Sequence, residues 1–341
     1  MPRIRSKGKN VAYILPTGGQ VAFRNHIAEV SDPATIRQIL QGGDYALELE
    51  ITRPIAEAKS ILIIRGSGLG DVLLMTPILR HIKTIVNPTA ELSYMAGQYK
   101  GLLDGNPYID NVFDLSELPM DMVTRFDYQA KTTMCEFERD SNVLHRVDVF
   151  ARTVEGLEIP LLDKHLDYYV KERERAWAEK VLPRTGQKTA LMVLSATASN
   201  RMFMAEKLKA IANGLIVLGW KVILADNLSK GWEADGVLNL CRKTGIREVA
   251  ALVDRCDVLI SPDTGTYHIG AALDKPIVVY FGAIDYRLRL THEKNIVLVA
   301  ESADCYPCHR YDCHSPKCLR DIPAERVVAA TEEAWGRWCK T

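Results

Sequence analysis

Short apolar runs alternate with amphipathic stretches along the chain from Lys59 onward. SILIIR (60–65) has the composition of a buried strand, and the apolar stretch VLLMTPILRHIKTIV after it predicts a helix. ELSYM (91–95) follows as the next strand. Because strands that alternate with helices form βαβ units, this rhythm predicts a parallel sheet that begins near residue 59.

The same alternation begins again after a polar, charged connection at residues 160–188, which includes one helix. TALMVLS (189–195) predicts the first strand of the second series. Apolar residues at helical spacing then form one face that ends at Gly219: Leu208, Ile211, Ala212, Leu215 and Leu218. Further strands are predicted at KVILA (221–225), DVLIS (257–261) and PIVVYFG (276–282), with the helix IREVAALVDRC before the second of them.

The first 58 residues do not follow this rhythm. VAYILPTGGQVAF predicts a hairpin that turns on Gly18 and Gly19, and SDPATIRQILQGG predicts a short, capped helix. We interpret residues 1–58 as an added module. It is either a structural appendage or a part that serves acceptor binding or assembly.

Composition and charge narrow the class of protein. The 341 residues suit two α/β domains, and 47% hydrophobic with 25% charged residues is typical of globular proteins. Lys plus Arg equals Asp plus Glu at 43 each, so no nucleic-acid partner is expected. With no bilayer-length apolar run and no signal-peptide pattern at the start, we expect a cytoplasmic protein.

A glycine-rich turn follows the first strand of the first series. In RGSGLGD, Gly66, Gly68 and Gly70 lie between that strand and a helix, where backbone N–H groups can face a cleft. The spacing is not G-x-G-x-x-G and no acidic residue ends the second strand, which disfavours a dinucleotide site. Asp71 is either a helix N-terminal residue stabilised by the helix dipole or a general base at a cleft.

A second strand-to-helix junction carries similar chemistry. In SPDTGTYHIGAAL, the strand DVLIS leads into Asp263, Thr264, Gly265 and His268. Thr264 and the backbone of Gly265 can hold a phosphate at a helix N-terminus, and Asp263 can accept hydrogen bonds from sugar hydroxyls. The alternative is a simple turn followed by a core histidine.

These residues resemble glycosyltransferase family 9, the ADP-heptose heptosyltransferases and their relatives, over about residues 59–335. RGSGLGDVLLMTPILRHIK resembles the opening Arg, Gly-Asp and Thr-Pro pattern of the family, and GLLDGNPYIDNVFDL resembles its Asn-Pro-Tyr segment. SPDTGTYHIGAALDKPIVVYFGAID resembles its most diagnostic block. SATASNRMF and GAIDYRLR depart from the usual pattern, which leaves the nucleobase and the sugar open.

The resemblance implies a GT-B fold, in which two Rossmann-like domains face each other, and an inverting displacement without a catalytic metal. It assigns Asp71 as the base on the acceptor and the block from Asp263 to His268 as donor-binding. Arg201 stands where the family usually has a lysine, so we expect it to face the donor diphosphate. Three hydroxyl residues of the same loop are further candidates for that phosphate site: Ser195, Thr197 and Ser199.

Four cysteines crowd together near the C-terminus, at Cys305, Cys308, Cys313 and Cys318. Four thiolates suit one tetrahedral zinc ion or a rubredoxin-like iron, and neither would leave an open catalytic position. An unmetallated thiol cluster or a role in acceptor binding are the alternatives. The resemblance adds that such a segment binds iron in the related autotransporter heptosyltransferases.

The predicted organisation is a module (1–58), an acceptor domain (59–185), a donor domain (186–323) with the cysteine knot, and a C-terminal helix (324–341) that packs back toward the first domain. We expect transfer of a sugar, heptose from ADP-heptose, to a lipopolysaccharide core sugar or a protein Ser or Thr hydroxyl. A non-catalytic binding or assembly protein and a GT-B nucleotide-sugar epimerase are the alternatives. Peripheral contact with the inner membrane and homo-oligomer formation stay open.

Overall fold

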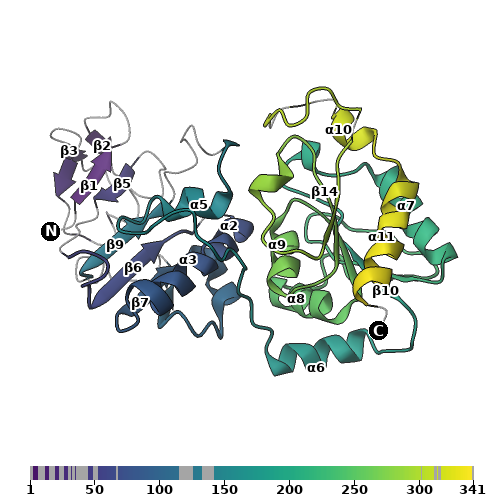
Figure 1. Cartoon of the computed structure of the whole chain (residues 1–341), viewed down its shortest axis with the longest axis horizontal. Coiled ribbons are helices and arrows are strands. Elements are labelled where there is room, and N and C mark those ends of the chain that lie inside the picture. Colours follow the sequence, from purple (N-terminus) through teal and green to yellow (C-terminus); the bar gives the residue numbers. More distant parts are fainter. Residues whose placement is uncertain are drawn as a thin grey trace.

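The chain folds around two separate parallel sheets, seen in Figure 1 as two bodies joined by a connection near α6. The computed structural model describes residues 53–66, 68–114, 126–132, 142–300, 302–310, 313 and 316–339, and strand segments before residue 53. No helix in this described part is long and apolar enough to cross a membrane.

The first body holds a four-stranded parallel sheet in the order β8-β7-β6-β9. Its strands are β6 (Ser60–Ile64), β7 (Glu91–Met95), β8 (Asn111–Phe113) and β9 (Tyr128–Lys131), and its helices include α2 (Leu69–Leu74), α3 (Thr76–His81) and α5 (Arg146–Ala151). The predicted strands at 60–65 and 91–95 are confirmed. The second half of β6 and of β7 is fully buried, as expected of strands covered on both faces.

The second body holds a six-stranded parallel sheet in the order β12-β11-β10-β13-β14-β15. Its strands are β10 (Thr189–Met192), β11 (Lys221–Leu224), β12 (Val237–Asn239), β13 (Val258–Pro262), β14 (Ile277–Tyr280) and β15 (Asn295–Leu298). Its helices include α7 (Ala205–Val217), α8 (Ile246–Arg255), α9 (Gly265–Ala272) and α10 (Lys317–Arg320). Strand order reverses between β10 and β13, and the carboxyl ends of such neighbours are where doubly wound sheets bind ligands.

The N-terminal strands form two small antiparallel sheets. β1 (Arg3–Ser6) lies between β4 (Ile27–Glu29) and β5 (Tyr45–Glu48), and β2 (Ala12–Ile14) pairs with β3 (Gln20–Ala22). The pairing of β2 with β3 confirms the predicted hairpin. The short helix predicted after it falls mostly outside the described residues.

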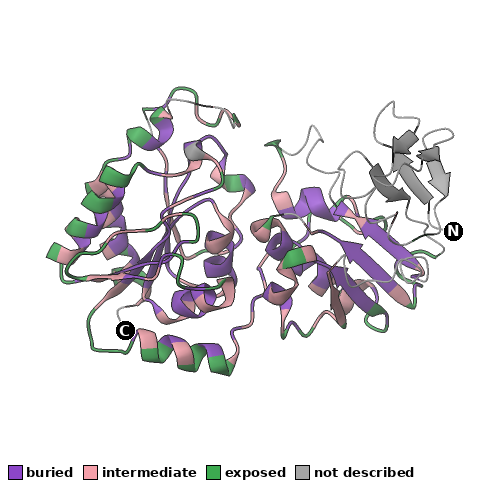
Figure 2. Ribbon diagram, turned by 180° about the vertical axis from the view of Figure 1, so that it is seen from behind, coloured by how far each residue is buried: buried purple, intermediate pink, exposed green. Residues whose placement is uncertain are grey.

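The predicted connection at residues 160–188 contains its one helix, whereas the C-terminal helix lies in another place than expected. The connection helix α6 (Glu172–Val181) packs against α8 of the second body (Figure 1). The C-terminal helix α11 (Ala324–Trp338) packs on α7 and on strands β13 to β15, so the expectation that it returns to the first domain is wrong. Its apolar stripe, which includes Val327, Ala330 and Ala334, is buried in the core of the second sheet (Figure 2).

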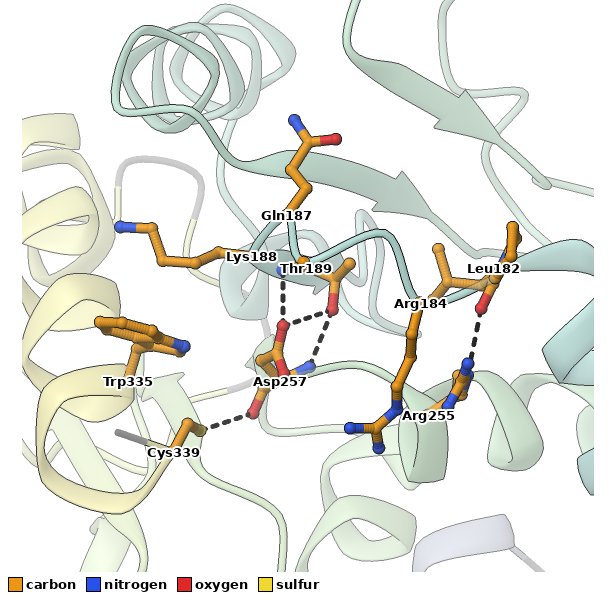
Figure 3. Close-up of a pocket in the computed structure, with 11 residues that line it drawn as sticks. Leu182, Arg184, Gln187, Lys188, Thr189, Arg255, Asp257, Trp335 and Cys339 are labelled. Carbon is orange, nitrogen blue, oxygen red and sulfur yellow. Dashed lines mark hydrogen bonds between the residues drawn. The ribbon is translucent and has the colours of Figure 1, made fainter. Parts of the chain in front are cut away.

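Polar side chains contact α11 at the amino ends of β10 and β13, beside a cavity of about 230 Å³. Figure 3 shows Lys188 reaching across Trp335, with its ammonium 4.9 Å from the ring centroid. Asp257 accepts hydrogen bonds from the backbone N–H and the hydroxyl of Thr189, both at 2.8 Å. This cavity therefore lies at the opposite end of the sheet from the strand-to-helix junction at Asp263.

Candidate functional site

A pocket of about 290 Å³ opens between the two bodies, where the junction after β6 faces the junction after β13. The first body contributes Gly68, Leu69, Gly70, Asp71, Leu74, Tyr99 and Arg146 to its lining. The second body contributes Thr197, Arg201, Asp263, Thr264, Gly265, His268 and Arg289. The fold thus brings the two motifs found in the sequence to the same pocket, although nearly 200 residues separate them.

The helices α2 and α9 contact each other across this pocket, and two glycines allow this close approach. A β-carbon on Gly70 would lie 2.6 Å from Cδ2 of His268, and one on Gly265 would lie 2.4 Å from Cδ2 of Leu69. Real β-carbons do not approach other atoms so closely. Each body therefore presents a glycine to a side chain of the other, which lets the pocket close.

Asp71 lies in the first turn of α2 and is held by two arginines. Nη2 of Arg65 donates to Oδ2 of Asp71 at 2.5 Å, and Nε of Arg146 lies 3.8 Å from Oδ1. The Arg65 guanidinium is fully buried and also donates to the carbonyl of Thr132 at 3.1 Å. The ring of Phe150 lies between the two guanidinium groups, 4.7 Å from Arg65 and 5.1 Å from Arg146.

This arrangement leaves one carboxylate oxygen of Asp71 on the pocket side. Oδ2 is fixed by Arg65, whereas the ion pair of Oδ1 among the described residues is the longer one, to Arg146. Since the buried arginine fixes the direction of the carboxylate, Oδ1 can accept a proton from a hydroxyl that enters the pocket. Arg65 follows β6 directly, and a charged residue at the end of a buried strand was a signal that the sequence analysis did not use.

On the facing side, Asp263 is nearly buried between Arg201 and His268. Its Oδ2 lies 3.9 Å from Nη1 of Arg201, and its Oδ1 lies 4.0 Å from Nε2 of His268. Burial lowers the pKa of His268 to about 4, against the opposing attraction of Asp263. His268 is therefore neutral at pH 7, and its Nδ1 has no hydrogen-bond partner among the described residues.

The N-terminus of α9 points its unpaired backbone groups into the pocket. Thr264 is the N-cap residue and its side chain makes no capping hydrogen bond, so the first N–H groups of this helix stay available. Free N–H groups at the positive end of a helix bind anions such as phosphate. Arg201 and Arg289, which line the same pocket, add positive charge beside that helix end.

Two of the predicted residues, Ser195 and Gly66, do not line this pocket. The hydroxyl and backbone N–H of Ser195 both donate to the carboxylate of Asp226, at 2.7 and 2.8 Å, which ties Ser195 to the loop after β11. Gly66 packs instead against Gly97, to which a β-carbon would come within 3.4 Å. The backbone of Ser199 belongs to the 3₁₀ turn 199–201, and its side chain lies outside the described residues.

One residue, His145, joins the first body to the loop that carries Arg289, without any sequence signal. Nε2 of His145, at the start of α5, lies 3.0 Å from the carbonyl oxygen of Leu290. Burial lowers the pKa of His145 to about 4, so its ring is neutral and can donate this bond through Nε2. Arg146, the next residue, then reaches Asp71.

The four clustered cysteines line a second cavity, of about 290 Å³, together with Asn200 and Ala283. Burial and the neighbouring Cys305, Cys308 and Cys313 raise the pKa of the Cys318 thiol to about 11. Across the described residues, no group of three or more His, Cys, Asp or Glu side chains is arranged to hold a metal ion. The structure thus gathers the four cysteines around one cavity but does not show the expected metal knot.

Comparison with known proteins identifies the family of the chain. A family model described as glycosyltransferase family 9 (heptosyltransferase) matches residues 131–319, which is more than half of the chain. Lipopolysaccharide heptosyltransferase 3 of Escherichia coli strain K12 is 27% identical over 207 residues, which cover 56% of this chain and 60% of that relative. Lipopolysaccharide heptosyltransferase 1 of Campylobacter coli is 20% identical over 340 residues, covering 81% of this chain and 99% of that relative.

Solved structures share the two-sheet architecture. ADP-heptose lipopolysaccharide heptosyltransferase II of E. coli superposes with a TM-score of 0.67 at 16% identity, over 82% of this chain and 100% of that chain. The iron-containing dodecameric glycosyltransferase TibC of enterotoxigenic E. coli gives a TM-score of 0.61 at 14% identity, over 85% and 81%. The fold and the family match confirm the resemblance drawn from the motifs: the chain belongs to glycosyltransferase family 9.

Proposed function

We propose that the protein is an inverting glycosyltransferase that moves heptose from ADP-heptose to an acceptor hydroxyl, within the pocket between the two sheets. The observation that carries this proposal is the meeting of Asp71 with Asp263 and Arg201 around that pocket. Heptosyltransferases among the relatives support the sugar, and an E. coli enzyme named for ADP-heptose supports the nucleotide.

The chemistry needs one base and one anion site, on opposite sides of the sugar. In this proposal Oδ1 of Asp71 accepts the proton of the acceptor hydroxyl while the hydroxyl oxygen bonds to the anomeric carbon. The bond from that carbon to the nucleoside diphosphate breaks on the opposite face, so the configuration inverts. The released negative charge goes to Arg201, Arg289 and the N–H groups at the start of α9.

Asp263 and His268 have a positioning role in this scheme. Asp263 faces the donor side and can accept hydrogen bonds from sugar hydroxyls, and it also fixes the direction of Arg201. His268 is neutral and packs under Gly70, so it contributes to the closed contact of the two bodies rather than to charge. Closure of that contact would exclude water, which favours transfer over hydrolysis.

The acceptor is proposed only as a class, a lipopolysaccharide core sugar or a protein Ser or Thr hydroxyl. We assign acceptor binding to residues 59–185, donor binding to residues 186–323, and choice of acceptor to the module at residues 1–58. We place the reaction in the cytoplasm, at the face of the inner membrane when the acceptor is a lipid-linked sugar.

For the four cysteines we propose a structural zinc or iron ion. Their sulfurs line one cavity and suit either metal, and the TibC neighbour is described as iron-containing. Binding would require the sulfurs to draw together, since no metal-binding group is arranged in the described residues. Elemental analysis of the purified protein should find one metal ion per chain, and Cys308→Ser should lose it. A metal-free wild-type protein would contradict this part of the proposal.

The donor half of the proposal is tested by binding and turnover. Wild-type protein should bind ADP and release it from ADP-heptose when a hydroxyl acceptor is present. Arg201→Met should weaken ADP binding by about tenfold or more, because it removes a charged hydrogen-bond donor from the leaving group. Arg184→Met, an exposed arginine at the other end of the second sheet, is the matched control and should bind ADP normally.

Two alternative functions make different predictions in the same assay. A non-catalytic binding protein would release no ADP from any nucleotide sugar, whereas an epimerase would convert the donor to a new sugar without an acceptor. Inversion at the anomeric carbon of a product that contains the acceptor is expected only of the glycosyltransferase.

A further inference from the structure

The described residues 302–310, 313 and 316–318, which we call the cysteine segment, touch both loops that supply donor-side cations to the catalytic pocket. One of these loops, residues 195–201, ends in Arg201, and the other, residues 283–290, carries Arg289. Both follow the carboxyl ends of strands of the second sheet. The cysteine segment leads into α10, which Figure 1 labels at the top of the second body.

Asn200 joins the cysteine segment to the first loop. It is 2% exposed, and its Nδ2 donates to the carbonyl of Arg310 at 2.7 Å, between Cys308 and Cys313. Asn200 also lines the cysteine cavity and directly precedes Arg201 in the chain. A shift of the cysteine segment must therefore displace Asn200, the residue next to the proposed diphosphate ligand Arg201.

The backbone of Asn200 is fixed from a second side. Its carbonyl oxygen lies so close to Gly282 that a β-carbon there would come within 2.4 Å of it. Oδ1 of Asn200 is buried and accepts no hydrogen bond from the described residues, which costs stability. Burial of Asn200 with an Oδ1 unbonded among the described residues lowers the stability of the fold, and in return its Nδ2 donates to the carbonyl of Arg310. Positioning of the loop that carries Arg201 explains this arrangement better than stability of the fold does.

The second loop has its own bonds to the cysteine segment. The backbone N–H of His309 donates to the carbonyl of Ala283 at 2.9 Å. The backbone N–H of Tyr286 donates to the hydroxyl of Tyr306 at 3.3 Å. Since Tyr306 lies between Cys305 and Cys308, the cysteine segment supports the loop of Arg289 as well.

We propose that the cysteine segment positions the donor-side cations, with Asn200 as the residue that couples it to Arg201. This inference rests on the proposed function of Arg201 at the diphosphate. Binding of nucleoside diphosphate then orders the loops against the segment, and any change at the cysteines changes donor affinity. Because coupling between two sites is reciprocal in free energy, a change at the cysteines that weakens ADP binding must itself be opposed when ADP is bound.

The experiment uses the full chain as purified and measures both directions of the coupling. Isothermal titration gives the Kd of ADP, and reaction with dithiobis(nitrobenzoate), followed by peptide mass spectrometry, gives the rate at which Cys305, Cys308 and Cys313 are modified. Wild type should react about fivefold more slowly when saturated with ADP, and the modified protein should bind ADP about fivefold more weakly.

The variants separate coupling from general damage. Asn200→Ala should raise the Kd of ADP severalfold and remove the effect of ADP on the cysteine rates. Asn200→Asp keeps the shape of the side chain, loses the donated bond to Arg310 and should behave in the same way. Asn239→Ala removes another buried amide of the same sheet, bonded to the carbonyl of Lys230, and should behave as wild type.

The possible results are distinct. If wild type binds ADP but ADP leaves the cysteine rates unchanged, or if both Asn200 variants keep wild-type ADP affinity and coupling, the inference is wrong while the proposed function stands. If wild type binds no ADP at all, the proposed function fails and the inference fails with it.

Discussion

The contact between α2 and α9 gives the sharpest mutational prediction, because it involves a glycine of one body and a side chain of the other. In Gly70→Ala the added β-carbon would lie 2.6 Å from Cδ2 and 3.2 Å from Nε2 of His268. A normal carbon contact needs roughly 3.5–4 Å, so the two helices must separate by about 1 Å. Overpacking of this kind costs about 1–3 kcal/mol.

Because the clash lies between the two bodies, we expect it to be relieved by opening of the pocket rather than by unfolding. At about 1.4 kcal/mol for each factor of ten, kcat/KM for ADP-heptose should fall by about 10- to 100-fold. The thermal unfolding temperature should stay near that of wild type. Steady-state transfer assays and calorimetry measure the two quantities.

Gly101→Ala is the matched control, since a β-carbon at Gly101 meets nothing within 4 Å. It should leave kcat/KM unchanged. If Gly70→Ala transferred sugar at the wild-type rate, the pocket would not need this contact. If it unfolded the protein as a whole, the strain would not be confined to the contact between the bodies.

Three further predictions concern stability. Arg247→Met should cost about 3 kcal/mol at pH 7 in urea unfolding, because it leaves Glu174 buried without its 2.8 Å partner. Burial opposes ionisation of Glu174, but its bonds with Arg247 outweigh burial and lower its pKa, so the part of this difference due to Glu174 should shrink as the pH falls below about 4.5. Wild type should lose up to about 3 kcal/mol more stability than His268→Gln between pH 6.5 and pH 4, because the unfolded chain binds a proton there that the buried ring refuses. Lys188→Met should lower the free energy of unfolding by about 1 kcal/mol through loss of the contact with Trp335, without changing ADP affinity.

The sequence predicted the parts of the site that depend on local pattern. Apolar runs located the strands before Asp71 and before Asp263, and the carboxyl ends of parallel strands necessarily lie at one edge of a sheet. That the two edges face each other followed from the family resemblance. It did not follow from spacing, since no local rule relates two sheets in separate bodies.

Other features depend on which of several possible partners a side chain or a helix contacts, and a single sequence does not reveal that choice. Ser195 follows β10 as expected of a ligand residue, yet Asp226 takes both its hydroxyl and its backbone N–H. The apolar stripe of α11 carries no signal for one body over the other, and in the structure it packs against α7 and strands β13 to β15. Arg146 reaches the pocket as the first residue of the short helix α5 and Arg289 from the turn after Leu288, and apolar periodicity carries no information at such ends of elements.

The central claim is that Asp71 acts as the base in a pocket whose other half holds the donor. The most direct measurement is the rate of heptose transfer by Asp71→Asn, with the Kd of ADP measured on the same protein and Asp235→Asn, an exposed aspartate of the second body, as control. The account predicts a loss of about 100-fold or more in kcat, near-normal ADP affinity and a fully active control. Transfer by Asp71→Asn at the wild-type rate would contradict it.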